Sequence, residues 1–280
     1  MPRLLLFLVL LLAVATLVRL GASRRQKPSE HSWLPKGWPD ALNQLALFAL
    51  ADLCYETVRG VAEGNNALAF ANARSIVDIE KGLGLFFEPD FQAWAMAHRV
   101  LIDFANFMYV NSHFVVTSCL LVWIYLRHNR HFYFVRNMFM VAMALALVGY
   151  LSFPTAPPRF LPELGFVDTI AYYADVRHDS ALVALFINPY AAVPSMHVAF
   201  ALMLAVPTIR LVRRPLVKVL WALYPPLVAS VVIVTGNHWW FDAAAGALVA
   251  LTAALISRYV LARLRPADWA WEPSVAEAPV

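Results

Sequence analysis

Two histidines and an aspartate have the residue types and the spacing that covalent phosphoryl transfer requires. His238 and Asp242 are four residues apart, so on a helix they share one face and can contact each other. His197 stands at the start of a different apolar run. One imidazole could attack phosphorus, the carboxylate could hold its tautomer, and the second imidazole could protonate the leaving oxygen. The alternative is that these polar residues only cap helices at a membrane edge.

The spacing also separates the expected roles of the two histidines. His238 has a carboxylate on its own helical face, whereas the equivalent position for His197 is occupied by Ala201. A nucleophile that becomes cationic gains most from an adjacent carboxylate, while an acid that must release its proton is hindered by one. We therefore expect His238 to be the nucleophile and His197 the general acid.

A proline-rich segment ahead of these motifs supplies a cation. Residues 154–159 read Pro-Thr-Ala-Pro-Pro-Arg, and the three prolines restrict the backbone, so we expect a rigid shelf that presents Arg159. A planar guanidinium suits bidentate contact with phosphate. The alternative is an interfacial arginine that binds lipid headgroups.

Composition places these motifs in a membrane protein. The 280 residues are 61% hydrophobic and 14% charged, whereas soluble domains average about 45–50% and about 25%. The surplus must face lipid and no barrel-type alternation is visible, so we expect an all-α, polytopic membrane helical bundle. The net charge of +4 comes from basic residues at the ends of apolar runs, where the positive-inside rule explains them without a nucleic-acid partner.

The apolar runs predict three parts of the chain. Residues 1–40 hold a first membrane helix at 4–20, either retained or cleaved as a signal peptide, and then a linker. Residues 41–265 form a six-helix core, and residues 266–280 form a disordered cytoplasmic tail. Within the core, residues 65–98 are amphipathic and should lie in the interface plane. The six core spans are expected at residues 41–59, 100–126, 133–153, 194–209, 219–234 and 239–261.

Charge predicts which side of the membrane the motifs face. Residues 127–136, 210–218 and 263–265 are basic, which marks their side as cytoplasmic. The motif-bearing loops fall on the opposite side, so we expect an extracytoplasmic site in the plasma (inner) membrane. The two cysteines, Cys54 and Cys119, lie inside apolar runs and predict neither a disulfide nor a metal–thiolate site.

The order of the motifs resembles a known family. Arg159, the triplet Ser195-Met196-His197 and the pair His238…Asp242 are similar to the signature of the type 2 phosphatidic acid phosphatase superfamily, over roughly residues 41–264. The resemblance implies a metal-independent lipid phosphatase or phosphotransferase that forms a phosphohistidine and needs no cofactor. Pro-Thr-Ala-Pro-Pro-Arg, Pro-Ser-x-His and Gly-Asn-His-x3-Asp look closest to the branch that contains inositol phosphorylceramide synthase.

The resemblance also implies a role for each site residue. His238 would be the nucleophile, Asp242 would orient it, and His197 would act first as general acid and then as base. The phosphoryl oxygens would be bound by Arg159, Ser195, Asn237 and backbone amides at a helix N-terminus, whose dipole favours an anion. The expected partners are a lipid phosphate or phospholipid substrate and the surrounding membrane lipids.

The chain departs from the family signature at its other cationic positions. Ser152 stands where the family has lysine, and Val232 stands where it has arginine. Two neighbours of the signature also differ, since Phe160 replaces a proline and Met196 a glycine. Candidates to replace the missing cations are Lys81, Arg177 and His178.

Other functions remain open at this stage. The acceptor could be water or an alcohol, so headgroup transfer between lipids is an alternative to hydrolysis. A haem-binding or ion-conducting protein using His113, His197 and His238 is disfavoured, because the last two lie at the membrane surface beside Arg159. A non-catalytic membrane scaffold is the remaining alternative.

Overall fold

Every regular element that the structure describes is helical. The computed structural model describes residues 34–61, 66–174 and 191–271, and within them the only strand-type contact is a single parallel bridge between Thr155 and Ala191. The predicted all-α bundle is therefore confirmed. The expected first helix at residues 4–20 lies outside the described residues.

The helices follow the predicted apolar runs closely. Before the proline-rich segment they are α2 (Gly37–Val61), α3 (Asn66–Gly82), α4 (Glu88–Met96), α5 (Arg99–Phe107), the π-helical turn η2 (Met108–Ser112), α6 (His113–Arg127) and α7 (Asn129–Ser152). After it they are η3 (Pro158–Phe160), η4 (Pro162–Leu164), α8 (Thr169–Ala174), α10 (Met196–Leu211), α11 (Pro215–Val234), α12 (Trp240–Ile256), η5 (Ser257–Leu261), α13 (Ala262–Leu264) and α14 (Pro266–Trp269).

Three of these helices are long and apolar enough to cross a membrane. They are α7 (Asn129–Ser152), α11 (Pro215–Val234) and the continuous run of α12, η5 and α13 (Trp240–Leu264). The bent pair formed by α5 and α6 would make a fourth span. The chain is thus a multi-pass helical membrane protein. Helix α10 is apolar but shorter, and α2 does not meet the same criterion because polar residues interrupt it. The count of six core spans plus one therefore stays a prediction.

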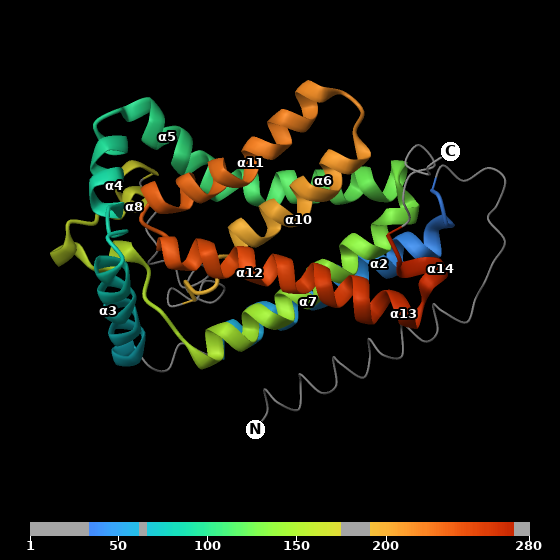
Figure 1. The fold of residues 1–280 in the computed structure, drawn as a ribbon, viewed down its shortest axis with the longest axis horizontal. Helices are drawn as coiled ribbons and strands as arrows, with labels where there is room; N and C mark the ends of the chain where they lie inside the picture. Colours follow the sequence, from blue (N-terminus) through green and yellow to red (C-terminus); the bar gives the residue numbers. More distant parts are fainter. Residues whose placement is uncertain (1–33, 62–65, 175–190, 272–280) are drawn as a thin grey trace.

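Helix α12 is central to the bundle. It packs against α7 on one side and α10 on the other, and α10 in turn packs against α11 (Figure 1). The main buried cluster lies between α7, α10 and α12 and includes Phe139, Met203, Leu204 and Ala253. Because lipid tails are as apolar as these side chains, close packing between the helices, rather than removal from water, stabilises this part of the bundle.

The amphipathic segment forms two short helices at one end of the bundle. Helix α3 buries Ala69, Ala73, Ile76 and Val77 and leaves Ile79 exposed. Figure 1 shows α3, α4 and α8 gathered at this end, with α13 and α14 at the other. The helices are as predicted, and their position in the interface plane stays a prediction.

The opposite end is tied together by a polar cluster. Asp40 accepts hydrogen bonds from the hydroxyls of Tyr125 (2.8 Å) and Tyr133 (2.7 Å). Arg136 lies over the Trp269 ring, and Trp269 and Trp271 pack against the main core. The expected disorder of the tail therefore does not apply to residues 266–271, because these tryptophans bury apolar surface there. Residues 272–280 lie outside the described part.

The proposed orientation can be tested by cysteine labelling. Glu163 is exposed in η4 at the end that carries the motifs, and Arg213 is exposed in the basic α10–α11 connection. In a chain without Cys54 and Cys119, a cysteine at 163 should react with an impermeant thiol reagent from outside the cell. A cysteine at 213 should react only after lysis, because basic loops stay cytoplasmic. The reverse pattern would invert the topology.

Candidate active site

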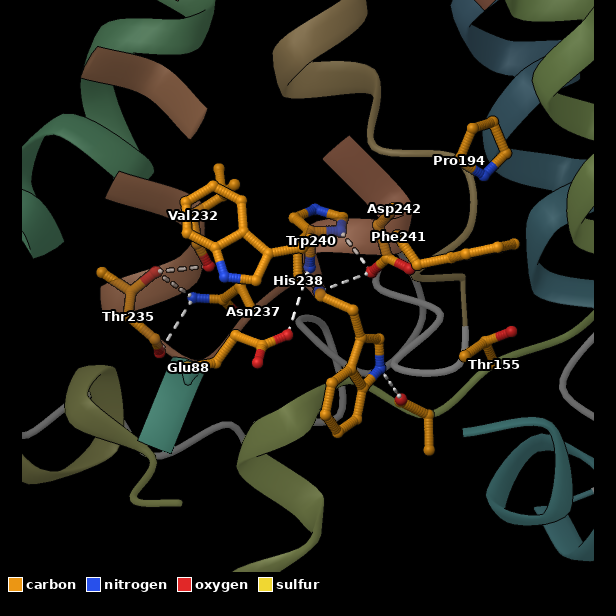
Figure 2. A network of polar contacts seen from close by, with 12 residues as sticks. Glu88, Thr155, Pro194, Val232, Thr235, Asn237, His238, Trp240, Phe241 and Asp242 are labelled. Atoms are coloured by element: carbon orange, nitrogen blue, oxygen red, sulfur yellow. Dashed lines mark hydrogen bonds and ion pairs between the residues drawn. The ribbon is translucent and has the colours of Figure 1, made fainter. Parts of the chain in front are cut away.

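The predicted His–Asp pair is formed and buried. After α11 the chain turns at Gly236, whose φ of 69° suits a residue without a side chain, and α12 begins at Trp240. Asp242 Oδ2 lies 3.1 Å from His238 Nδ1 and also accepts a hydrogen bond from the Trp239 amide at 2.9 Å (Figure 2). Because the carboxylate engages Nδ1, the nitrogen left to react is Nε2.

The second histidine comes from α10 and faces the first. The rings of His197 and His238 lie edge to face with centroids 5.6 Å apart. Tyr109 of η2 also contacts His197, and the two rings stack with centroids 4.6 Å apart. The structure thus brings together two histidines that are 41 positions apart in the sequence, with only one of them paired to Asp242.

Close contact between two helices sets the distance between these rings. The Ser195 amide donates to the backbone oxygen of Asp242 at 3.0 Å. In α12, a Cβ added at Gly246 would lie 2.2 Å from the Ser195 backbone oxygen, so only glycine fits there. The start of α10 therefore rests directly on the backbone of α12.

Ser195 has a buried hydroxyl with no hydrogen-bond partner in the described part of the chain. Its side chain is fully buried, and Oγ makes no hydrogen bond to the described residues. A buried hydroxyl of this kind costs free energy unless a ligand or water satisfies it. The position, two residues before His197, suits an oxygen of a bound phosphoryl group.

Arg159 is held beside the histidine turn by both its backbone and its side chain. Its amide donates to Gly236 O at 2.9 Å, and its Nη1 donates to Asn237 Oδ1. Its Nε lies 3.6 Å from Asp168 Oδ2, which is an ion pair rather than a hydrogen bond. Only 12% of the Arg159 side chain is exposed, so the guanidinium is oriented before any substrate arrives.

Asn237 has both ends of its amide engaged within the protein. The oxygen accepts from Arg159, while Nδ2 donates to the Thr235 hydroxyl at 2.9 Å (Figure 2). Contact of Asn237 with a phosphoryl group stays a prediction. What the structure shows is that Asn237 orients Arg159.

The proline-rich segment is anchored along its length. Trp239 Nε1 donates to Ala156 O at 3.1 Å, and the Ala156 amide donates to Ala69 O of α3 at 3.1 Å. Asn72 of α3 donates to Pro154 O at 2.8 Å. These bonds explain how a segment far from the histidines in sequence is held against them.

Of the three candidate replacement cations, only Lys81 lies in the described part of the chain. Lys81 is exposed and lies over the Phe86 ring, 5.0 Å from its centroid. Arg177 and His178 fall outside the described residues, as does the side chain of His113. Among the residues that the structure describes, no group of three His, Cys, Asp or Glu side chains could hold a metal ion.

Three buried polar residues near the site were missed in the sequence. Gln92 of α4 bonds Val167 through both ends of its amide, at 2.8 and 3.0 Å, and so supports the connection that carries Asp168. Glu80 and Glu88 contact the first turn of α12. The only signal was a polar residue at each of these positions in an otherwise amphipathic segment.

Comparison with protein families identifies the relationship. The family model described as PAP2 superfamily matches residues 74–256, about two thirds of the chain. The chain belongs to the PAP2 superfamily. The matched region contains Arg159, Ser195, His197, Asn237, His238 and Asp242. Comparison with curated proteins and with solved structures found no match.

Membership of the PAP2 superfamily indicates an enzyme that acts on phosphoric esters, as a phosphatase or a phosphotransferase, in a membrane setting. The resemblance first noted from short motifs thus extends from α3 to the end of α12.

Proposed function

We propose that this PAP2 superfamily protein cleaves or transfers the phosphoryl group of a lipid phosphate through a covalent phosphohistidine on His238, at the extracytoplasmic face of the plasma (inner) membrane. The observation that most supports this proposal is the contact between two facing histidines, one of which is paired to a buried carboxylate. His238 Nδ1 is 3.1 Å from a buried carboxylate, while the His197 ring, 5.6 Å away, stacks on Tyr109.

The first step follows from the pairing of His238 with Asp242. His238 Nε2 attacks phosphorus, and the P–O bond to the lipid alcohol breaks as His197 donates its proton to the leaving oxygen. Asp242 stabilises the imidazole as it becomes cationic. The products of the step are the free lipid alcohol, neutral His197 and phosphorylated His238.

The second step reverses the proton transfer. His197 takes a proton from water or from an acceptor alcohol, whose oxygen attacks phosphorus as the P–N bond breaks. In this proposal Arg159, the Ser195 hydroxyl and the amides at the start of α10 stabilise the charge on the phosphoryl oxygens, which is usually the largest catalytic contribution. The burial of Arg159 and the unpartnered Ser195 hydroxyl among the described residues support these roles.

Headgroup transfer is the second candidate function. The motifs Pro-Thr-Ala-Pro-Pro-Arg, Pro-Ser-x-His and Gly-Asn-His-x3-Asp favour it, because they resemble the inositol phosphorylceramide synthase branch. A small pocket lined mostly by apolar residues lies beside His197. Its lining is Met108, Tyr109, His197, Tyr224, Val228, Val231 and Val232.

Metal dependence gives the direct test of this chemistry. The purified protein should release inorganic phosphate from a panel of lipid phosphates in detergent, with EDTA present, because His238 and Asp242 engage each other and the mechanism uses no metal. Vanadate should inhibit, since its trigonal-bipyramidal adduct resembles the transition state. Loss of activity in EDTA that Mg²⁺ restores would contradict the mechanism. Headgroup transfer would instead appear as product only when an acceptor alcohol is added.

A further inference from the structure

Two buried carboxyl groups meet at the first turn of the helix that carries Asp242. Glu80 Oε1 of α3 accepts from the Phe241 amide at 3.0 Å, and Glu88 Oε1 of α4 accepts from the Trp240 amide at 3.4 Å (Figure 2 shows the second contact). These amides belong to the first turn of α12, where no intrahelical acceptor exists. Each glutamate is at most 3% exposed.

The second oxygen of each carboxyl group can find a hydrogen-bond partner only in the other carboxyl group, as far as the described residues show. Neither Glu80 Oε2 nor Glu88 Oε2 has another hydrogen-bond donor among the described residues, and the two side chains hydrogen-bond when one is protonated. Burial raises the pKa of Glu80 to about 9, and the hydrogen bond to Glu88 adds to the rise; the Phe241 amide lowers it. The charges that face Glu80 are acidic too, Glu88 from α4 and Asp242 from α12.

We propose that Glu80 and Glu88 share one proton and act as a positioning pair, which holds the first turn of α12 so that His238 and Asp242 keep their reactive geometry. Two ionised carboxylates in this buried place would repel each other, whereas one carboxyl and one carboxylate can bond each other and still accept from the helix. The role of the pair in the reaction rests on the proposed function.

The position of the pair explains why the first turn needs it. Asp242 Oδ2 already accepts from the Trp239 amide, and the two glutamates accept from the next two amides in order. The three carboxyl groups therefore satisfy three consecutive donors between His238 and Asp242. Removing one acceptor frees the turn, and a displacement of about 1 Å at a reacting group can cost on the order of 10² in rate.

The pH dependence of the protein's thermal stability should reveal the shared proton. An unfolded chain releases the Glu80 proton near the ordinary pKa of 4.5, but the folded protein keeps it up to about 9. Between these values the folded state binds more protons, so the stability of the natural protein falls as pH rises. Glu80→Gln keeps the hydrogen bond without that proton. Its Tm should exceed that of the natural protein at pH 8 by roughly 2–4 °C or more, and by much less at pH 5.

Activity and spectroscopy complete the test. Glu80→Gln should keep kcat at neutral pH and, unlike the natural protein, retain it above about pH 9. Glu80→Leu should lower kcat by on the order of 10² with little change in KM. The infrared band of a protonated carboxyl should disappear in Glu80→Gln. It should persist in the matched control Asp78→Asn, which changes an exposed acid of the same helix.

Equal Tm gains at pH 5 and pH 8, or a normal kcat in Glu80→Leu, would overturn the proposal. A cation bound between the glutamates is the competing outcome, and it would appear as a loss of Tm on chelation that Glu80→Gln abolishes. The Tm and infrared measurements need no turnover. If the natural protein neither released phosphate nor transferred a headgroup to an added alcohol, the proposed function would be rejected separately.

Discussion

His238→Ala should reduce turnover to the uncatalysed background and abolish any covalent phosphoenzyme. The attacking nitrogen is then missing. We do not expect His197 to replace it, because Ala201 stands at the position relative to His197 that Asp242 occupies relative to His238. Losing the nucleophile of a covalent enzyme typically costs on the order of 10⁶ in kcat. Rapid acid or base quenching with a ³²P-labelled lipid phosphate should trap label on the natural protein and none on the variant.

The matched control is His98→Ala. His98 is exposed at the start of α5, and its ring bonds only the nearby Trp94 O among the contacts described, so its loss should leave labelling unchanged. Label that still accumulates in His238→Ala and disappears in His197→Ala would exchange the two roles.

His197→Ala should lower activity on natural lipid phosphates by on the order of 10²–10⁴, the usual contribution of a general acid. A lipid alkoxide is a poor leaving group, so it needs the proton that this ring donates. A nitrophenyl phosphate leaves without protonation, and the variant should keep much of its activity on that substrate.

The ratio of the two activities measures the role of the acid. The ratio of nitrophenyl phosphate to lipid phosphate turnover should rise strongly in His197→Ala and stay constant in Tyr109→Phe, which keeps the stacked ring. A uniform loss on both substrates would assign His197 to binding rather than to proton transfer.

The sequence was sufficient to predict the helical fold and the contact between His238 and Asp242. Apolar runs show where helices form, and a four-residue spacing on one helix is a local property, so the His238–Asp242 contact could be predicted from numbering alone. The sequence predicted that Arg159 lies on the same side of the membrane as the two histidines. Its orientation depends on Asn237 and Asp168, which come from different segments and meet only in the fold.

The supporting residues could not be predicted, because their partners are backbone amides. Glu80, Glu88 and Gln92 lie in a segment whose pattern indicates an amphipathic helix, and a polar residue there normally faces water. Nothing in the pattern distinguishes them from the exposed Asp78, although they are almost completely buried. The residues directly after α13 were predicted to be disordered, because the tail contains proline and charged residues. That prediction gave too little weight to Trp269 and Trp271, which pack on the core.

The contact between Ser195 and α12 has a consequence for how a substrate would enter and leave. The Ser195 amide donates to the Asp242 backbone oxygen, and the Ser195 backbone lies against Gly246, where no side chain intervenes. Because these contacts join the start of α10 to α12, the two helices cannot serve as a hinge. The two imidazoles therefore keep their separation throughout a catalytic cycle. A substrate therefore has to reach the histidines without parting α10 from α12, and also without displacing the bonds that hold the Arg159 segment and the first turn of α12.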